Sequence, residues 1–404
     1  MENKSKPNLR FPEFEAEWEK KKLGEVAKFS KGKGISKSDI TEDGIYECVR
    51  YGELYTRYGE VIREVYSKTN FNIEKSVVSE ENDVIIPASG ETQIDIATAS
   101  CVLKSGVILG GDLNIIKTNK NGVFLSYYLN NKRKLDIANL AQGISVVHLY
   151  ASQLALLNLN FPSLPEQTKI ASFLTTVDEK LQSLKKKKTL LKQYKKGVMQ
   201  KIFSQELRFK DNNGNEYSEW EDKKLQDILI EVNEKTKTSG KYRILSSTSK
   251  GLFNQDEYFT RDVASKDNSG YKILKKGQLV FSPQNLWLGN INVNMNFEIG
   301  IVSPSYKIFS FDEKFTLAEY CQYFLLTPKM MFEYEQSSTQ GASVVRRNLD
   351  MYKFLSIEFL LPSINEQTKI ANFLSAIDDK IQAVEVQIEK MEVWKKGLLQ
   401  QMFC

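Results

Sequence analysis

The sequence predicts an α+β fold in which two globular mixed α/β domains are separated by two long helices that form an antiparallel coiled-coil spacer. Three observations lead to this prediction. One segment occurs twice, at 161–204 and 361–404, and the two copies align without a gap. Both copies carry apolar residues at helical spacing. The residues outside the copies mix strand-like and helix-like patterns.

Length and composition are those of an ordinary globular protein. At 404 residues, with 41% apolar and 26% charged residues, the chain has room for two or three domains. Its formal net charge of +5 permits a nucleic-acid partner without requiring one. No apolar run approaches the roughly 20 residues that span a bilayer, and the N-terminus is polar. We therefore expect a soluble cytoplasmic protein with no membrane partner.

Histidine and cysteine content excludes several kinds of site. The single histidine, His148, excludes catalytic zinc sites that need two or three histidines. Four cysteines lie far apart without a C-x-x-C pair, which argues against a zinc ribbon, a redox dithiol or a secreted disulfide framework. We expect no bound metal.

Each copy of the repeated segment is expected to form one long helix. In coiled coils the apolar positions recur at alternating spacings of four and three residues. The second copy keeps this spacing, and the first keeps it except at Lys188, which either turns outward to solvent or sets the register of the pair. The positions expected at the helix interface, here called the spacer seam, are Ile170, Leu174, Val177, Leu181, Leu184, Leu191, Ile370, Leu374, Ile377, Ile381, Val384, Ile388 and Met391.

The two copies differ in charge and slightly in their first turn. The first has ten lysines and three acids, a net charge of +7, whereas the second has a net charge of −1. The two helices should therefore attract each other, so an intramolecular antiparallel pair is the simplest arrangement. The run Lys185–Lys188 is either a solvated face or a contact to DNA phosphate or an acidic partner. Pro165 suits a first helical position, and Asn365 is expected to act as a cap.

The repeat continues into the globular parts. The frame R-F…E-W-E-x-K-K-L occurs at 10–23 and at 208–225, and Q-G-x-S-V-V occurs at 142–147 and at 340–345. The interiors, 24–81 and 226–276, share little. One scaffold with two different interiors is what a molecule that reads two targets would need. Strands are expected within 82–91, 101–118, 277–285 and 299–311, and helices within 123–140 and 315–335.

The duplicated P-S-x-x-E-Q-T-K-I-A-x-F-L helix start and the Q-G-x-S-V-V segments resemble the DNA-specificity subunit of type I restriction-modification enzymes, over essentially the whole chain. The resemblance implies target recognition domains at 1–160 and 208–360, each reading one half of a bipartite double-stranded DNA site. It implies that the helical regions 161–207 and 361–404 form the spacer and dock two methyltransferase subunits. It also implies a non-catalytic chain without a cofactor: S-adenosylmethionine belongs to the methyltransferase, which methylates adenine N6, and ATP and Mg belong to two restriction motor-nuclease subunits.

DNA-contacting candidates come from the resemblance and from basic residues. The resemblance points to the polar turn after the I-I-P or V-F-S strand and to the Q-G-x-S segment. Glutamine and asparagine can read adenine, arginine can read guanine, and serine or lysine can hold phosphate. Each residue is otherwise a turn former or a solvated surface group. The candidates are Lys31, Lys33, Arg50, Arg57, Ser89, Thr92, Gln93, Ser145, His148, Arg243, Lys250, Ser282, Gln284, Asn285, Ser343, Arg346 and Arg347.

The sequence argues against two other function classes, an enzyme and a pure scaffold. An amino-methyltransferase needs a Pro-Pro loop and an ATPase needs G-x-x-x-x-G-K-(S/T), and the sequence contains neither. The segment F-S-K-G-K-G at 29–34 only faintly resembles a cofactor-binding glycine loop. A pure scaffold has no reason to diversify its two interiors, and DNA binding with a strong salt dependence would distinguish it from a specificity subunit.

Overall fold

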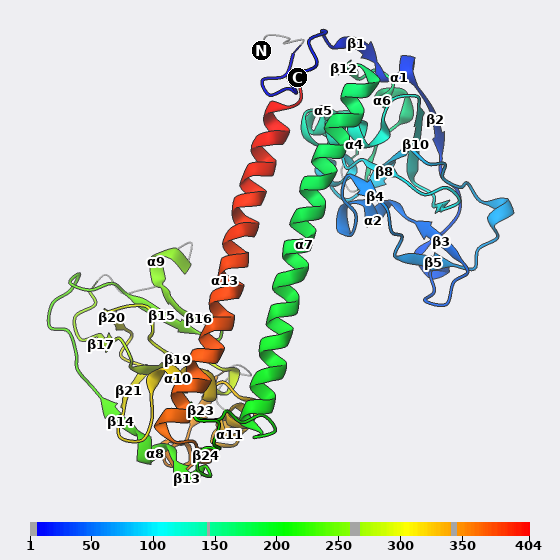
Figure 1. The fold of residues 1–404 in the computed structure, drawn as a ribbon. Helices are drawn as coiled ribbons and strands as arrows, with labels where there is room; N and C mark the ends of the chain where they lie inside the picture. The colour runs from blue at the N-terminus through cyan, green and yellow to red at the C-terminus, as the bar shows by residue number, and fades with distance from the viewer. Residues whose placement is uncertain (1–5, 144–145, 259–266, 341–345) are drawn as a thin grey trace. The chain divides into compact units, whose positions relative to one another are not determined.

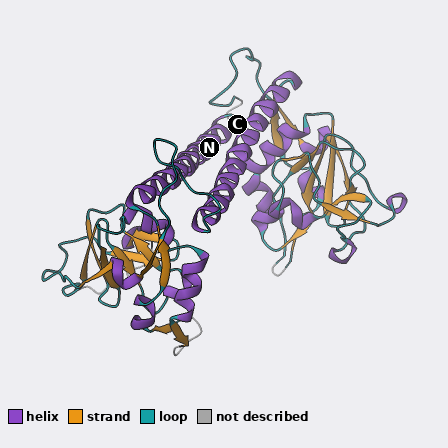
Figure 2. Ribbon diagram, turned by 60° about the horizontal axis from the view of Figure 1, so that its bottom comes forward, coloured by secondary structure: helices purple, strands orange, loops and turns teal. Residues whose placement is uncertain are grey.

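The computed structural model describes residues 6–143, 146–258, 267–340 and 346–404, and the chain divides into two compact units (Figure 1). Unit 1 comprises Met1–Lys186 together with Val386–Cys404, and unit 2 comprises Lys187–Glu385. Each unit therefore contains one globular part, the first half of one long helix and the second half of the other. Figure 2 shows the strands of each unit gathered in its globular part.

A five-stranded sheet forms the centre of unit 1, in the order β2-β10-β6-β8-β4. Its neighbouring strands are antiparallel except for β4 and β8. All residues of β6 are buried, as expected of a strand in the middle of a sheet. The strands are β2 (Ala27–Lys31), β4 (Val61–Ile62), β6 (Asp83–Pro87), β8 (Ser100–Val102) and β10 (Leu113–Thr118), with a second sheet of β5 (Ser67–Thr69), β3 (Tyr46–Val49) and β9 (Ile108–Leu109).

The segment 123–140 is helical, as predicted, and forms two helices. Asn121 caps the first of them, because its side-chain oxygen accepts a hydrogen bond from the N–H of Phe124. This helix buries Tyr127 and Tyr128 in the core of unit 1. The helices of this globular part are α1 (Leu23–Val26), α2 (Tyr51–Thr56), α3 (Gln93–Ile96), α4 (Gly122–Asn131), α5 (Lys134–Leu140) and α6 (Ala151–Leu154).

Unit 2 has a four-stranded sheet in the order β14-β21-β18-β19, with every neighbouring pair antiparallel. A hairpin and two further strand pairs flank it. The strands are β14 (Leu229–Val232), β18 (Leu279–Phe281), β19 (Ile291–Val293) and β21 (Lys307–Phe311), the hairpin β15 (Leu245–Thr248) and β16 (Gly251–Asn254), and the pairs β17 (Lys272–Lys275) with β20 (Ile299–Val302) and β22 (Ser338–Gln340) with β23 (Arg347–Leu349).

The segment 315–335 is also divided, into α10 (Ala318–Phe324) and α11 (Pro328–Gln336). Pro328 has no N–H to continue the first helix, and it stands at the first position of the second, where none is needed. The hydroxyl of Thr327 caps this start by accepting the N–H of Met330. Two further helices of this part are α9 (Gln255–Tyr258) and α12 (Met351–Leu355), and α8 (Leu225–Ile228) follows β13 (Glu221–Lys224).

The long helices are α7 (Leu164–Phe203) and α13 (Ile364–Gln401). Each follows a serine whose carbonyl accepts the first helical hydrogen bond: Gln167 donates to Ser163 at 3.0 Å and Gln367 to Ser363 at 2.9 Å. Asn365 therefore lies inside the first turn, so the prediction that it caps α13 was wrong. The cap position is held instead by the serine of the Pro-Ser pair that precedes both helices.

The spacer seam is packed along its length. Eleven of its thirteen positions are less than a tenth exposed, and Leu191 and Met391 are half-buried. The first positions of each helix also belong to the core of a globular part: in unit 1, Ile170 and Leu174 share a core with Leu398. The seam therefore joins helix to helix and helix to globular part with one set of residues.

Ion pairs within unit 1 show that the helices run antiparallel. Asp178 of α7 pairs with Lys395 of α13 at 2.6 Å, and Lys185 pairs with Glu392 at 2.7 Å. Advancing along α7 therefore corresponds to moving back along α13. The pair of Lys185 and Glu392 joins the lysine-rich copy to the more acidic one, as the charges of the two copies predicted, whereas the pair of Asp178 and Lys395 runs the other way.

Unit 2 repeats this pattern with the roles of the helices exchanged. Lys188 and Lys192 of α7 both reach Glu385 of α13, at 2.9 and 3.2 Å, and Lys195 reaches Asp378 at 2.6 Å. Lys188 thus interrupts the apolar seam but finds a carboxylate on the partner helix. These lysine contacts lower the pKa of Glu385 from its usual value.

The end of each long helix completes the core of the other repeat's globular part. In unit 1 the ring of Phe403 lies 5.5 Å from Phe124 and stacks on Tyr128 at 5.4 Å. The hydroxyl of Tyr128 donates to the carbonyl of Cys404 at 2.7 Å. In unit 2 the equivalent Phe203 packs against Tyr320 and Phe324.

Candidate nucleic-acid interface

One edge of the unit 1 sheet brings together the two segments singled out in the first globular part. The strand β6 ends at Pro87, and β7 (Ser89–Gly90) follows directly. β7 pairs with β11 (Val147–His148), with Ser89 opposite His148. The polar turn and the Q-G-x-S segment, more than 50 residues apart in sequence, are therefore neighbours.

The predicted residues at this edge differ in exposure. Ser89 is buried, whereas Thr92, Gln93 and His148 are exposed. The hydroxyl of Thr92 caps α3 by accepting the N–H of Asp95 and donates to its carboxylate at 2.6 Å. Gln93 is therefore better placed than Ser89 to reach an external ligand. Ser145 lies outside the described residues.

The basic candidates of unit 1 fall around the same edge. Lys31 ends β2 and pairs in register with the start of β10, which in turn pairs with Pro87 at the end of β6. Lys31 and Lys33 are exposed there, and Arg57 is exposed after α2. Arg50, which precedes α2, keeps a quarter of its side chain exposed. This edge offers exposed positive charge beside a polar turn, a combination suited to DNA phosphates and base edges.

Unit 2 builds the same juxtaposition with different residues. The turn after β18 holds Ser282, Gln284 and Asn285, and the backbone N–H of Arg347 donates to the carbonyl of Gln284 at 3.0 Å. Gln284 and Arg346 are exposed. Here again the turn and the segment that follows Q-G-x-S meet. Ser343 lies outside the described residues.

The guanidinium of Arg347 is held within unit 2. It lies 4.1 Å over the ring of Trp287 and 3.1 Å from Glu335. Arg243 precedes β15, whereas the exposed Lys250 lies in the turn after it, so they occupy opposite ends of the hairpin. At the turn end of the hairpin, Asn292 of β19 donates to the carbonyl of Thr248 at 2.9 Å.

A buried ion pair fixes each globular part to its long helix. In unit 1, Glu166 at the start of α7 accepts two hydrogen bonds from Arg10, at 2.7 and 2.8 Å, and one from the indole of Trp18. In unit 2, Glu366 is bound in the same way by Arg208 and Trp220. These contacts account for the repeated frame R-F…E-W-E, whose arginine and tryptophan converge on the repeated glutamate.

Two short strand pairs accompany these contacts. β1 (Glu19–Lys22) pairs with β12 (Asn158–Phe161), and β13 (Glu221–Lys224) pairs with β24 (Glu358–Leu361). In each case the second strand leads straight into the long helix. The start and the end of each globular part are therefore fixed at the same place.

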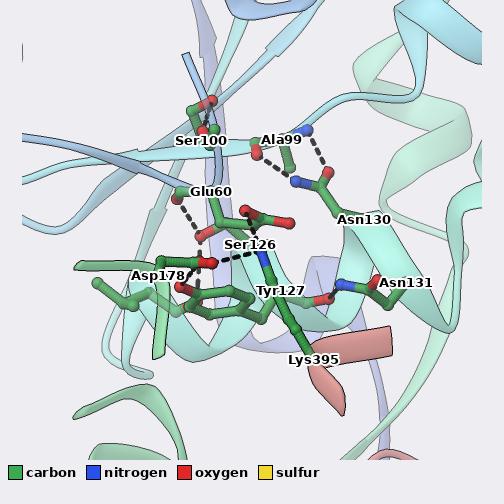
Figure 3. A network of polar contacts seen from close by, with 11 residues as sticks. Glu60, Ala99, Ser100, Ser126, Tyr127, Asn130, Asn131, Asp178 and Lys395 are labelled. Carbon is green, nitrogen blue, oxygen red and sulfur yellow. Dashed lines mark hydrogen bonds and ion pairs between the residues drawn. The ribbon is translucent and has the colours of Figure 1, made fainter. Parts of the chain in front are cut away.

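A second repeated cluster joins both long helices to each globular part, and sequence reasoning missed it (Figure 3). In unit 1 the hydroxyl of Tyr127 donates to Asp178 at 2.5 Å, and Lys395 lies 2.6 Å from the same carboxylate and 3.7 Å from Glu60. Burial, and then the charge of Asp178, raise the pKa of Tyr127 well above its usual value.

The equivalent cluster of unit 2 consists of Tyr323, Asp378 and Lys195. Tyr323 donates to Asp378 at 2.9 Å, and Lys195 contacts both carboxylate oxygens at 2.6 and 2.7 Å. Burial, followed by the charge of Asp378, raises the pKa of Tyr323 as well. The signal was present in the sequence, because the aspartate and the lysine are identical in the two copies.

The described part of the chain contains no cluster of three or more histidine, cysteine or acidic residues that could hold a metal ion. Within the same residues, no helix is both long and apolar enough to cross a membrane. The cysteines of this part, Cys48, Cys101, Cys321 and Cys404, are buried free thiols.

Comparison with known families adds to this geometry. The family described as "Type I restriction modification DNA specificity domain" matches residues 15–193 and again residues 217–392. The two matches cover most of the chain and follow the two repeats. The chain belongs to this family. Its members are the specificity component of type I restriction-modification enzymes, so the resemblance stated from the motifs is confirmed.

Individual proteins are similar to this chain along nearly its full length. The type I restriction enzyme MjaVIII specificity subunit of Methanocaldococcus jannaschii is 24% identical, over 97% of this chain and 92% of its own. A crystal structure of the S subunit of a type I restriction-modification system from M. genitalium covers 99% of both chains, with 16% identity and a TM-score of 0.60. A structure from a study of complex assembly and conformational transition of the type I system covers 98% of this chain and 99% of its own, with 14% identity and a TM-score of 0.53. The two structures support the predicted fold class.

Proposed function

We propose that this specificity chain is the DNA-recognition subunit of a type I restriction-modification complex in the cytoplasm. The globular parts 1–160 and 208–360 each read one half of a bipartite site in double-stranded DNA. The helical regions set the gap between the halves and dock two methyltransferase subunits. The chain itself is non-catalytic and holds no cofactor: the methyltransferase binds S-adenosylmethionine, and restriction subunits, where present, bind ATP and Mg.

One observation carries the recognition role. The same sheet edge is built twice, with a polar turn beside the segment that follows Q-G-x-S, but the exposed side chains differ. Unit 1 presents Gln93 and His148 there, whereas unit 2 presents Gln284 and Arg346. Different polar groups on one scaffold provide different hydrogen-bond patterns, which is what reading two unlike half-sites requires.

Exposed residues that the fold does not use support the docking role. Lys196 and Gln200 of α7, and Lys396 and Gln400 of α13, are exposed yet identical between the copies. The middle of each copy, from 183 to 194 and from 383 to 394, shares no residue. Burial does not explain why these exposed residues are identical in the two copies. Two copies of the same partner, bound at equivalent places on the two helices, explain it.

The test is to express the chain with its neighbouring methyltransferase subunit in a methylation-free host and to sequence the DNA for modified adenine. A split motif with two defined halves and a fixed gap is the expected result. A stable complex that modifies nothing and binds DNA no more tightly than a basic control protein would favour a scaffold instead.

Domain exchange tests whether the two halves are read separately. Replacing residues 1–160 by the equivalent part of another family member should change one half of the motif and leave the other and the gap unchanged. A change in both halves would contradict the modular assignment. The matched exchange of 208–360 should change only the other half.

Charge reversal tests the docking face. The double variant Lys196→Glu, Lys396→Glu should lose the methyltransferase subunits in size-exclusion chromatography while the chain stays folded. Lys201→Glu is the matched control, because Lys201 is exposed on the same helix but is replaced by glutamine in the second copy. Equal loss with the control would show that only general charge matters.

A further inference from the structure

A cavity of about 860 Å³ lies beside α2 in unit 1, and most of its lining comes from 24–81, the interior that shares little sequence with unit 2. α2 packs against β7, the strand of the polar turn, so the cavity adjoins the candidate interface. The backbone N–H of Ala88, at that turn, donates to the carbonyl of Asp112, one of the lining residues. The charged lining residues are Lys37, Asp39, Arg50, Glu53, Arg57 and Asp112.

Arg50 has unused hydrogen-bonding capacity at this cavity. Within the described residues, its guanidinium donates no hydrogen bond, and its Nε is buried without a partner. A buried donor left unpaired costs free energy, and such groups in native proteins need an explanation. A quarter of the Arg50 side chain remains exposed, and its terminal nitrogens donate no hydrogen bond within the described residues. The terminal guanidinium nitrogens of Arg50 can therefore donate hydrogen bonds to a ligand.

Glu53 fixes the guanidinium in place. It is 3% exposed, and its carboxylate accepts the backbone N–H of Arg50 at 2.9 Å and the hydroxyl of the buried Ser67. Its Oε1 lies 3.7 Å from a terminal nitrogen of Arg50, close enough to attract the charge but too far for a hydrogen bond. On the other side, a Cβ at Gly110 would lie 3.5 Å from the Cγ of Arg50, so the β9–β10 turn packs against the arginine stem.

The charge balance of the cavity decides the kind of ligand. Its three basic residues face three carboxylates. A phosphate would meet repulsion from Asp39 and Asp112 as well as attraction, whereas a neutral group with two acceptors would not. The O6 and N7 atoms of guanine are such a pair, and they match the planar fork of arginine.

Building on the proposed function, we propose that Arg50, positioned by Glu53, is a specificity-determining residue that binds O6 and N7 of a guanine in the half-site read by unit 1. The cavity then receives the edge of that base in the major groove. Arg57, exposed at the rim, contacts the adjoining phosphate.

The test uses the complex with the methyltransferase subunit, once its wild-type motif is known. Duplexes carry 7-deazaguanine, which lacks the N7 acceptor, at one guanine of the motif at a time. One guanine in a single half-site should lower the affinity of the wild-type complex about 10-fold, within the roughly 5- to 150-fold range of a bidentate contact. The Arg50→Ala complex should bind the guanine and 7-deazaguanine duplexes equally.

Two further variants separate the alternatives. Arg50→Lys keeps the charge and a donor but not the planar fork, so its discrimination at that guanine should lie between that of the parent and that of Arg50→Ala. Arg63→Ala is the matched control, because Arg63 forms an exposed pair with Glu179 away from this cavity. Equal weakening of Arg50→Ala on cognate and unrelated DNA would overturn the guanine assignment in favour of a phosphate contact.

Two outcomes can be read from the wild-type complex alone, without any variant. If the wild-type complex recognises a split motif but neither half shows a sensitive guanine, the inference about Arg50 fails and the proposed function stands. If the wild-type complex recognises no motif at all, the proposed function fails first. The two failures are therefore distinguishable.

Discussion

Glu166 accepts two hydrogen bonds from Arg10, which lies 156 residues earlier in the chain. The glutamate is 1% exposed, and the arginine side chain 13%. The same pair recurs between Glu366 and Arg208 in unit 2. A contact of this kind binds the first residues of a globular part to the helix that follows it. It thereby fixes the orientation of the candidate interface relative to that helix.

Removing one partner of this pair should be costly. Glu166→Ala leaves the guanidinium of Arg10 and the indole N–H of Trp18 without their acceptor, so we expect a loss of about 3–5 kcal/mol in the stability of unit 1. Amide hydrogen exchange of β1 and β12 would measure it locally. Glu13→Ala is the control, because its pair with Lys169 is half-exposed and should contribute little to stability. A Glu166→Ala loss as small as the control's would contradict the assignment.

The tyrosine of the second cluster should contribute less. Tyr127→Phe removes a hydrogen bond to the Asp178 carboxylate but leaves the contact from Lys395, so we expect a loss of about 1–3 kcal/mol. Tyr194→Phe, on the exposed face of α7, should change stability by less than about 0.5 kcal/mol. Denaturant titration of both variants would test the difference, and equal effects would contradict the role given to Tyr127.

Stability should fall at high pH, in part through this cluster. The pKa of Tyr127 is raised by burial and by Asp178, so the folded chain keeps a proton that the unfolded chain loses above pH about 10. The stabilisation is complete below that pH and is lost as the pH rises toward the folded pKa. Each such tyrosine adds up to about 1.4 kcal/mol per pH unit to the slope. Unfolding curves between pH 9 and 11 should be less steep in pH for Tyr127→Phe than for the parent.

Charge exchange should test the pairing of Lys188. Lys188→Glu places two acids together at Glu385 and should destabilise unit 2. The double variant Lys188→Glu, Glu385→Lys should recover only part of the loss, because Lys192 also pairs with Glu385 and would then face a positive charge. The coupling energy should be about 0.2–1 kcal/mol, since both side chains are roughly a third exposed. A double-mutant cycle at low and high salt would measure it, and additive effects would show that the pair contributes nothing.

Lengthening both helices should widen the recognised gap. Inserting seven residues into α7 between Leu184 and Leu191, and seven into α13 between Val384 and Met391, preserves the seam spacing. At 1.5 Å per residue this adds about 10 Å, close to three base pairs at 3.4 Å each. Sequencing of modified adenine would report the gap, with both half-sites expected to stay the same. An unchanged gap would contradict the spacer role.

The long helices could be predicted because their information is local and duplicated. The four-three spacing from Ile370 to Met391 and the gapless second copy leave few alternatives to a helix pair. The contact between Arg10 and Glu166 could not be predicted, because a spacing of 156 residues carries no period. The frame that contains Arg10 was visible as a repeat, but only the fold shows what it binds.

The candidate interface was predictable in its segments and less so in its residues. The turn at Ser89 and the strand at His148 stand out as sequence patterns, and the fold pairs them. That Ser89 is buried while Gln93 is exposed depends on which way each side chain points from a short strand and a capped turn, which no pattern specifies. Asn365 shows the same limit, because a one- or two-residue shift of the helix start changes a cap into an interior position.

Unit 1 buries Phe403 and Cys404, residues that are synthesised after the whole of unit 2. At about 5–20 residues per second, the 199 residues from Lys187 to Glu385 take roughly 10–40 s to synthesise, and unit 1 stays incomplete for that time. Unit 2 is a single continuous segment, so it can fold before unit 1 is complete. We expect chains stopped after Glu385 to contain a protease-resistant unit 2 and a protease-sensitive unit 1. Unit 2 would then fold before unit 1, although the synthesis of unit 1 begins first. In an unfinished chain, the incomplete unit 1 would be the part that proteases cut.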